Sequence, residues 1–325
     1  ALRLYLLGSP VMHGEDIIIS EEHYREQVRG MLLMLWNIYN FFVQNANIDG
    51  WDQQKVHSSQ LTVENVLDRW ISSLLHKLVK EVTESLDQYG TVAAIEKSRV
   101  FISEFSTWYI RRSRDRIGVT AEDQQDKDSF HQTCYIVLTT FCRLLAPITP
   151  FITEEIYRNL TNEASVHLTD LPIADQTKID EQLEKDMWQV RAIAEVGHAK
   201  RRELKLKVRQ PLQELRITNY KLQMDEGLLV LLKDELNVKQ INSVDGEGEL
   251  TVEFDTKVTP ELQAEGEARE IVRKIQEERK KLGTKMDEKV HIVLPTWPES
   301  FTDYIQKKAL GESLTKGEAF SVSRL

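Results

Sequence analysis

The sequence predicts a mainly α-helical protein, in which a helical bundle is followed by a smaller α+β domain. The 325 residues are 41% hydrophobic and 29% charged, with few Gly and Pro, a composition typical of helix-rich globular chains. Apolar residues recur at helical spacing through the first half, whereas short runs after Pro211 alternate as strands do. A chain of this length suggests about two domains.

Four long amphipathic helices are predicted in succession. The first starts after Ser20, whose followers Glu21 and Glu22 suit a helix N-terminus, and the second has near-heptad apolar spacing over 66–86. The third runs through 92–118 and ends in arginines. The fourth covers 128–146 and stops at a proline. Such helices bury their apolar stripes against one another, which predicts a bundle.

A fifth, short helix is expected from Pro150, with Thr149 as its N-cap, followed by an extended segment over 165–172 and a helix over 179–204. The predicted domain boundary lies between 205 and 206, so that the bundle with its following helix covers 20–205 and the α+β domain covers 206–325. The elements expected in the α+β domain are strands at 214–218, 238–244, 250–254, 289–295 and 320–325, and helices at 228–236 and 261–282.

Cysteine usage and hydropathy exclude several protein classes. Cys134 and Cys142 are eight residues apart in a helical pattern, about 12 Å along the axis, which is too far for a disulfide. The sequence contains no CxxC pair, the pattern typical of a cysteine-based zinc site. Both cysteines are therefore expected to be core residues of a reduced, cytoplasmic protein. No apolar run approaches the roughly 18 residues that span a bilayer. The chain opens in mid-helix without Met, which predicts a piece of a longer protein.

Motifs for catalysis are absent from the sequence. GxxxxGK[ST], GxGxxG, GxSxG and HExxH do not occur, and His13 and Lys285 have no nucleotide-binding context. His131 and Cys134 share a helix face, but two potential ligands make a weak metal site, and core packing explains them better. We therefore predict no catalytic residue and no metal site in this chain.

The segment TWYIRRSRDR (107–116) packs four arginines into six residues behind a Trp-Tyr pair. Guanidinium groups this close repel one another unless a polyanion or several carboxylates face them. Two interpretations stand side by side: contact with RNA, with the aromatic pair offering a stacking surface, or a salt-bridged helix end. Core packing is favoured for Trp108. The candidate RNA-binding residues are Trp108, Arg111, Arg112, Arg114 and Arg116.

A second basic stretch, from Lys200 to Lys221, holds eight Lys or Arg against two Glu. If LKLKVRQPL is extended, its alternation places Lys205, Lys207 and Arg209 on one side, a row of cations able to follow phosphates. The alternative is a solvated linker. In a third basic region, 269–281, acidic neighbours allow pairing along the helix, and a solvated face is expected.

Several segments together resemble the C-terminal part of the isoleucyl-tRNA synthetases, a family of class I aminoacyl-tRNA synthetases. The resemblance covers essentially the whole chain. LAPITPFITEEIY is shared in form with the valyl and leucyl enzymes, whereas WYIRRSRDR and KVRQPL are closer to the isoleucyl pattern. KVRQPL together with TPELQAEGEAREIVRKIQEERK points to the archaeal and eukaryotic type. The segments that carry the match are 61–74, 105–116, 144–157, 165–172, 207–212 and 259–280.

The resemblance implies an anticodon-binding bundle and a C-terminal appendage that serve recognition of isoleucine tRNA. Residues 1–19 would connect to a catalytic domain. The HIGH-type and KMSKS-type signatures are missing, so this segment alone is expected to be inactive and to hold no cofactor. ATP, Mg²⁺ and the catalytic and editing domains are expected of the intact enzyme, an isoleucine–tRNA ligase. A cytoplasmic monomer is expected.

Two alternatives stay open at this stage. The chain could belong to a valyl or leucyl synthetase, or it could be a helical scaffold for protein interactions that does not bind RNA.

Overall fold

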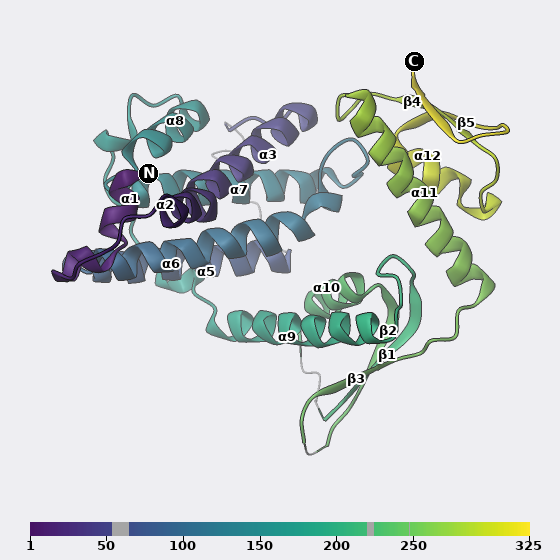
Figure 1. Ribbon diagram of the computed structural model, residues 1–325, viewed down its shortest axis with the longest axis horizontal. Helices are drawn as coiled ribbons and strands as arrows, with labels where there is room; N and C mark the ends of the chain where they lie inside the picture. Colours follow the sequence, from purple (N-terminus) through teal and green to yellow (C-terminus); the bar gives the residue numbers. More distant parts are fainter. Residues whose placement is uncertain (54–64, 220–223, 247) are drawn as a thin grey trace. The chain divides into compact units, whose positions relative to one another are not determined.

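The computed structural model describes residues 1–53, 65–219, 224–246 and 248–325; parts of the predictions that fall on 61–64 and on Lys221 lie outside these ranges. The chain divides into two compact units, Ala1–Glu184 and Lys185–Leu325 (Figure 1). This division falls within one long helix, earlier than the 205/206 boundary expected from composition.

Unit 1 is helical throughout its described elements, as predicted. Its long helices have the boundaries that the apolar spacing indicates to within a few residues, and short 3-10 and π segments join or interrupt them. The elements are α1 (Leu2–Leu7), η1 (Pro10–His13), α2 (Glu21–Gln27), η2 (Val28–Leu33), α3 (Met34–Asp49), α5 (Val66–Asp87), α6 (Thr91–Glu104), η3 (Phe105–Ile110), η4 (Arg114–Arg116), α7 (Gln124–Leu145), α8 (Pro150–Thr161), η5 (Val166–Leu168), η6 (Gln176–Lys178) and the start of α9 (Glu181–Glu203).

Side-chain caps fix where three of these helices begin. Ser20 accepts a hydrogen bond from the amide of His23, Asn65 from that of Leu67, and Asp123 from that of Asp126. Each cap satisfies an amide that the first helical turn leaves without a partner. Thr149 precedes α8 as predicted, but its hydroxyl donates to the carbonyl of Leu145 instead of accepting from the helix.

Aromatic rings from α6, η3 and α7 form the centre of the unit 1 core. Tyr109 and Phe130 stack with their planes 6° apart and their centroids 5.7 Å apart, and Phe105 lies 5.4 Å from Tyr109. Phe101 continues the row to Phe141 at 5.6 Å. These rings join the helix that carries the arginine cluster to α7, so the position of the cluster is set by the core.

The arginine-bearing helix ends earlier than predicted, at Arg112, and a π-helical turn, η3, precedes its end. Three consecutive residues of this turn, Trp108, Tyr109 and Ile110, are buried in the core. The remaining arginines therefore lie on the last helical residues and on the connection that follows.

Unit 2 contains two small sheets, each covered by two helices. Strand β1 pairs in parallel with β2 (Leu212 opposite Val238) and antiparallel with β3 (Leu215 opposite Phe254). Strand β4 pairs in the same way with β5 and β6. The elements are β1 (Leu212–Thr218), α10 (Glu226–Leu236), β2 (Val238–Val244), β3 (Thr251–Phe254), α11 (Pro260–Leu282), β4 (Val290–Leu294), η7 (Glu299–Phe301), α12 (Thr302–Ala309), β5 (Gly311–Lys316) and β6 (Ser321–Arg324).

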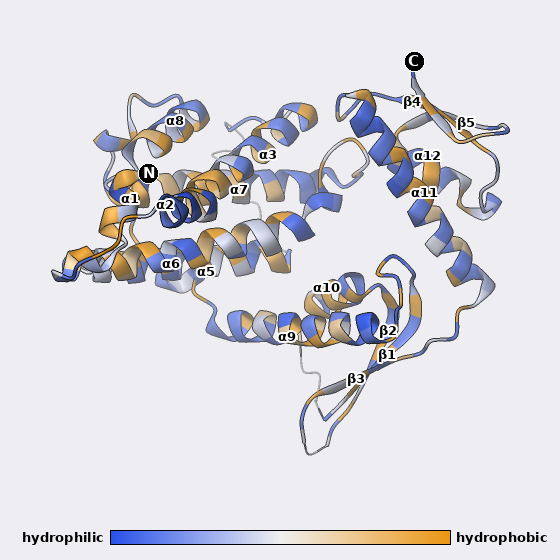
Figure 2. Ribbon diagram, viewed as in Figure 1, coloured by the Kyte–Doolittle hydropathy of each residue, from blue (hydrophilic) through white to orange (hydrophobic). Residues whose placement is uncertain are grey.

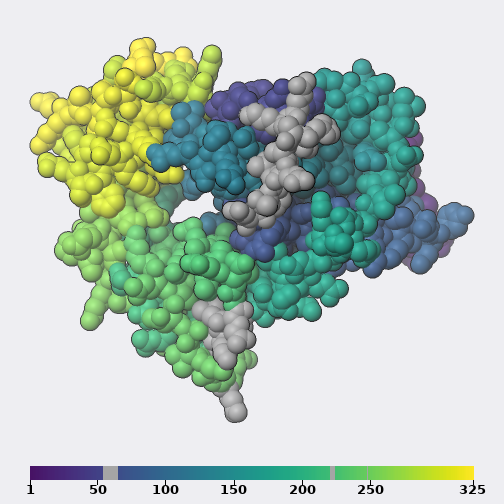
Figure 3. Space-filling model, turned by 180° about the vertical axis from the view of Figure 1, so that it is seen from behind, coloured from purple at the N-terminus to yellow at the C-terminus, as the bar shows by residue number. Residues whose placement is uncertain are grey.

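Most of the predicted elements of unit 2 are confirmed, and three features of the two units differ from the prediction. Helix α12 and strand β5 were not expected, and the segment 165–172 contains the 3-10 turn η5 instead of being extended. Helix α11 is mainly hydrophilic (blue in Figure 2), yet it buries Ala268 and Ile275 against β4. The surface of this last part of unit 2 is yellow-green to yellow in Figure 3.

Candidate nucleic-acid interface

The connection from the arginine-bearing helix to α7, residues 113–123, is held by side chains from three other elements. Arg116 reaches Asp68 in the first turn of α5 and Asp126 in the first turn of α7. The amide of Gly118 donates to Asp49 at the end of α3, at 3.1 Å. A segment without long regular structure is therefore fixed at one end of the helical unit.

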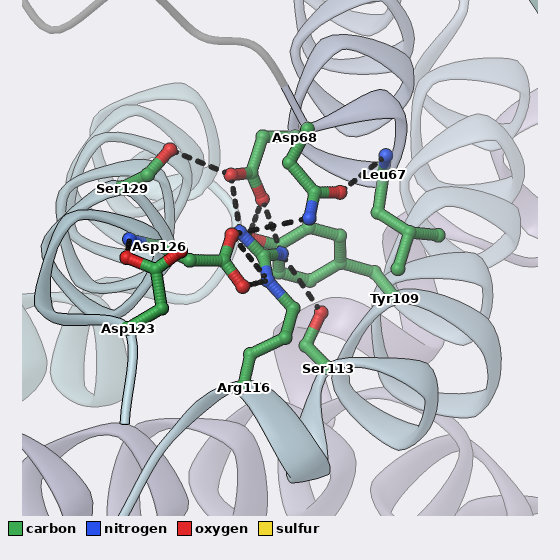
Figure 4. A network of polar contacts seen from close by, with 9 residues as sticks. Leu67, Asp68, Tyr109, Ser113, Arg116, Asp123, Asp126 and Ser129 are labelled. Carbon is green, nitrogen blue, oxygen red and sulfur yellow. Dashed lines mark hydrogen bonds and ion pairs between the residues drawn. The ribbon is translucent and has the colours of Figure 1, made fainter. Parts of the chain in front are cut away.

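Arg116 lies between two carboxylates (Figure 4). Its Nη1 and Nη2 donate to the two oxygens of Asp68 at 2.8 and 2.7 Å, and its Nε and Nη2 donate to Asp126 at 2.7 to 3.0 Å. Nη1 also donates to Ser113 at 3.3 Å. Because five contacts to the carboxylates use every nitrogen of the guanidinium, Arg116 is a structural residue in this arrangement.

Asp68 is fully buried and accepts from further donors. The hydroxyl of Tyr109 donates to it at 2.6 Å and that of Ser129 at 2.8 Å. Burial, and then the charge of Asp68, raise the pKa of Tyr109 well above its usual value, so its hydroxyl remains a donor. Burial alone would lower the pKa of Arg116, but hydrogen bonds to Asp68 and Asp126 raise it above its ordinary value. Both oxygens of Asp68 thus accept hydrogen bonds from two donors each.

A second buried carboxylate, Asp49, holds the other side of the same connection. Lys127 donates to it at 3.1 Å and His131 lies 2.8 Å away through Nε2. Burial alone would raise the pKa of Asp49, but the hydrogen bonds from His131, Gly118 and Lys127 together lower it. Burial lowers the pKa of His131, which favours a neutral ring that donates to Asp49.

The other cations of the cluster are placed differently. Arg111 and Arg114 are exposed and Arg112 is half-buried. The Nε of Arg111 donates to the carbonyl of Thr107 at 2.9 Å, and its guanidinium lies 5.3 Å from the ring centroid of Trp108. These contacts orient a guanidinium that still faces solvent.

Trp108 is only 6% exposed and lies in the core, so it offers too little surface to stack on a base. The prediction that Trp108 forms a stacking surface for RNA is therefore corrected. Arg116 is likewise corrected, because its donors already go to Asp68 and Asp126. The remaining arginines of the cluster are the exposed Arg111 and Arg114 and the half-buried Arg112, whose contact with RNA stays a prediction.

The basic loop of unit 2, defined as residues 204–210, is a series of turns and not the extended row that was expected. Lys205, Lys207 and Arg209 are all exposed on it. Arg201, counted among the basic residues of this stretch, is 1% exposed and lies beneath the loop. Because the segment forms turns and not an extended strand, the alternation argument for a common side does not hold.

Helix α11 is the third basic region, and its cations pair along the helix as predicted. Arg273 contacts Glu270 at 2.5 Å and also Glu277, and Lys281 contacts Glu278 at 2.6 Å. Over the whole of α11, six Glu offset six Lys or Arg, and with these exposed pairs the helix is unlike a polyanion-binding surface.

Within the ranges that the structure describes, no group of three or more His, Cys, Asp or Glu is placed to hold a metal ion. No helix in those ranges is long and apolar enough to cross a membrane. Two exposed groups of cations on a fixed backbone can bind polyanions, which is the chemistry that the arrangement offers.

Reasoning from the sequence missed the buried residues that fix both cation groups, although each leaves a signal. Asp68 stands among apolar residues on the buried face of α5, which is the signal that a buried ion pair leaves in a sequence. Arg201 follows Val190, Ala194 and Gly197 at helical spacing on the buried stripe of α9, a comparable signal.

Comparison with known proteins shows what the chain is similar to. Residues 68–217 match the anticodon-binding domain of tRNA ligase. An isoleucine–tRNA ligase of Dehalococcoides mccartyi is 39% identical over 92% of this chain and 32% of its own length. Those of Chlamydia caviae and Treponema denticola are 40% and 37% identical, over 74% and 79% of this chain and 23% and 25% of their own lengths. The chain thus spans at most a third of these relatives, all of them bacterial; the archaeal and eukaryotic type stays a prediction.

Among solved structures, a leucyl-tRNA synthetase of Agrobacterium radiobacter K84, in a ternary complex with tRNA and LeuAMS, is similar over 78% of this chain and 28% of its own, with 13% identity and a TM-score of 0.36. No conclusion rests on a likeness at that level.

Proposed function

Because residues 68–217 match the anticodon-binding domain of tRNA ligase, we propose that this chain binds the anticodon stem-loop of isoleucine tRNA for an isoleucine–tRNA ligase. The bound tRNA is held so that its acceptor end reaches a catalytic domain of the same polypeptide. That domain uses ATP and Mg²⁺, and an editing domain accompanies it. The intact enzyme acts as a monomer in the cytoplasm.

The exposed arginine cluster on its fixed connection is the structural observation that supports this proposal. Arg111 and Arg114 face solvent beside a backbone that Arg116 and Asp49 tie to three helices. RNA sequence is read in unpaired loops, where guanidinium groups contact phosphates and stack on bases. A fixed array of cations binds such a loop with little loss of protein conformational entropy.

A binding titration with the full chain and a labelled transcript of isoleucine tRNA tests the proposal. The matched controls are the same tRNA with an altered anticodon, the valine and leucine tRNAs, and an unrelated RNA of equal length. We expect isoleucine tRNA to bind at least about tenfold more tightly than its anticodon variant, equivalent to about 1.4 kcal/mol.

The outcomes separate the alternatives. Tighter binding of valine or leucine tRNA assigns the chain to one of those specificities instead. Equal binding of isoleucine tRNA and the unrelated RNA, with no loss when the anticodon is altered, contradicts anticodon recognition and leaves a helical scaffold.

A further inference from the structure

Unit 2 consists of two copies of one module. The first copy is α9, β1, α10, β2 and β3, and the second is α11, β4, α12, β5 and β6. In both sheets the first strand is central, the second joins it in parallel after a helix, and the third joins it antiparallel. The long helices of both copies, α9 and α11, are labelled in Figure 1.

The first copy has a buried arginine at the end of its long helix. Arg201, 1% exposed, donates through Nη1 to the carbonyls of Lys207 and Gln210 at 3.0 and 3.1 Å, and through Nη2 to that of Asn237 at 3.1 Å. Its guanidinium also lies 5.0 Å from the ring centroid of Phe254. These three acceptors are all backbone carbonyls, so its role is to fix the path of the loop.

The second copy repeats this contact at the same spacing. Arg279, 4% exposed, donates to the carbonyls of Lys285 and Glu288, at 3.1 and 2.6 Å. These acceptors follow their arginine by the same six and nine residues as in the first copy. The buried arginine that binds two loop carbonyls is therefore a feature common to both copies of the module.

The backbone around the two loops also corresponds. Position +4 after each arginine has a left-handed conformation, with φ of 56° at Lys205 and 63° at Gly283. At the start of the central strand, the amide of Leu212 donates to the carbonyl of Asn237 at 3.1 Å, and in the second copy Val290 donates to Leu310 at 3.0 Å. Left-handed backbone favours glycine, so Lys205 adopts this conformation at a local energetic cost.

The two loops differ in charge. Residues 204–212 contain three cations and no acidic residue, whereas 282–290 contain two lysines, one aspartate and one glutamate. Lys289 pairs with Glu312 at 2.6 Å, and Arg324 lies 3.1 Å from Glu288. In both copies a buried arginine holds the loop, but the loop is basic in the first copy and neutral in the second.

We propose that Arg201 is a positioning residue for RNA binding, which holds Lys205, Lys207 and Arg209 in place to contact tRNA phosphates, and that the equivalent loop of the second copy does not bind RNA. This inference rests on the proposed function. Arg201 affects RNA affinity by holding the loop carbonyls. Arg279 holds its own loop in the same way but has no effect on RNA affinity.

The test compares Arg201→Met with Arg279→Met in the full chain, since both substitutions remove the same kind of buried carbonyl contacts. Binding of the isoleucine tRNA transcript is measured over a series of KCl concentrations, and folding by circular dichroism and thermal unfolding. A third variant, Lys205→Gly with Arg209→Asp, gives the first loop the net charge of the second and keeps Arg201.

We expect the loop variant to lose about two from the slope of log affinity against log salt, roughly one for each cation removed from a phosphate. Arg201→Met should reduce that slope as well and weaken binding at least fivefold, and Arg279→Met should leave slope and affinity as in the wild type. If Arg201→Met fails to fold, Arg201→Lys, which keeps the charge but has no planar fork to join the carbonyls, is compared with Arg279→Lys.

If a folded Arg201 variant binds tRNA with the wild-type affinity and the wild-type salt slope, the positioning role of Arg201 is overturned. An equal loss in the Arg201 and Arg279 variants overturns the distinction between the loops. Absence of tRNA binding by the wild type overturns the proposed function itself, and this result is distinct because it precedes any substitution.

Discussion

Arg116 and Asp68 face each other as a two-point ion pair, with Nη1 and Nη2 at 2.8 and 2.7 Å from the two carboxylate oxygens. Their side chains are 9% and 0% exposed. The pair joins the segment that follows the arginine-bearing helix to the first turn of α5, 48 residues away in sequence. Of the four arginines in the cluster, Arg116 therefore fixes the backbone that carries the other three.

Replacing Arg116 by alanine should destabilise unit 1 strongly. Removal of one partner leaves Asp68 as a buried charge with fewer donors, which costs about 3–5 kcal/mol. Chemical unfolding followed by circular dichroism measures the change. Arg114→Ala is the matched control, since Arg114 is exposed and its loss should change stability by less than about 0.5 kcal/mol. Similar stabilities of the two variants would show that the pair contributes little.

Replacing Arg111 and Arg114 together by alanine should weaken tRNA binding and leave stability unchanged. Each lost phosphate contact reduces the salt slope of the affinity by about one. The control variant Lys80→Ala with Arg158→Ala removes two other exposed cations of unit 1 and so matches the change in net charge. Equal losses in both double variants would mean that net charge, and not the cluster, determines the affinity.

Trp108→Ala should destabilise the core by about 3–5 kcal/mol, the range for truncation of a buried aromatic side chain. Trp108→Phe keeps much of the packing and should cost less. Because Trp108 is in the core, the phenylalanine variant should bind tRNA with wild-type affinity, as measured by the same titration. A stable phenylalanine variant with weakened tRNA binding would instead place Trp108 in the interface.

Acidification below about pH 6.5 should destabilise unit 1 through His131. Burial lowers the pKa of His131 in the folded state, so between that lowered value and 6.5 the unfolded chain binds more protons. Stability is then fully present above 6.5 and falls as the pH decreases through this window. Urea unfolding at pH 7.5, 6.5 and 5.5 measures the slope.

His131→Gln should flatten that dependence, because glutamine can donate to Asp49 but does not titrate. A smaller dependence of stability on pH should remain because of His76, since burial lowers the pKa of His76 as well. An unchanged pH profile in His131→Gln would exclude His131 as the source.

Local sequence signals predicted the elements whose apolar pattern is strong. The second bundle helix, expected over 66–86, is observed as α5 at Val66–Asp87, and the strand expected at 238–244 is observed as β2 at those residues. Strand β5 was missed because its side chains are mostly half-buried or exposed, so no alternation of apolar and polar residues marks it.

The candidate site was predicted less completely. Every exposed cation of the two groups was identified, but Trp108 and Arg116 were grouped with them because their neighbours in sequence are basic. The path of residues 205–209 could not be predicted either. Arg201 draws the carbonyls of Lys207 and Gln210 toward the protein interior, which makes a turn of a segment whose alternation suggests a strand.

By itself, the sequence determined the helical bundle, the α+β appendage and the resemblance to tRNA ligases, because helical and strand periodicity and family motifs are carried by neighbouring residues. The tertiary structure alone decided which arginines bind protein and which face solvent. A guanidinium becomes structural when carboxylates or carbonyls from distant elements meet it, as Asp68 and Asp126 meet Arg116. Those partners are brought together only by the packing of helices far apart in the chain, where burial strengthens the attraction between charges that water would screen.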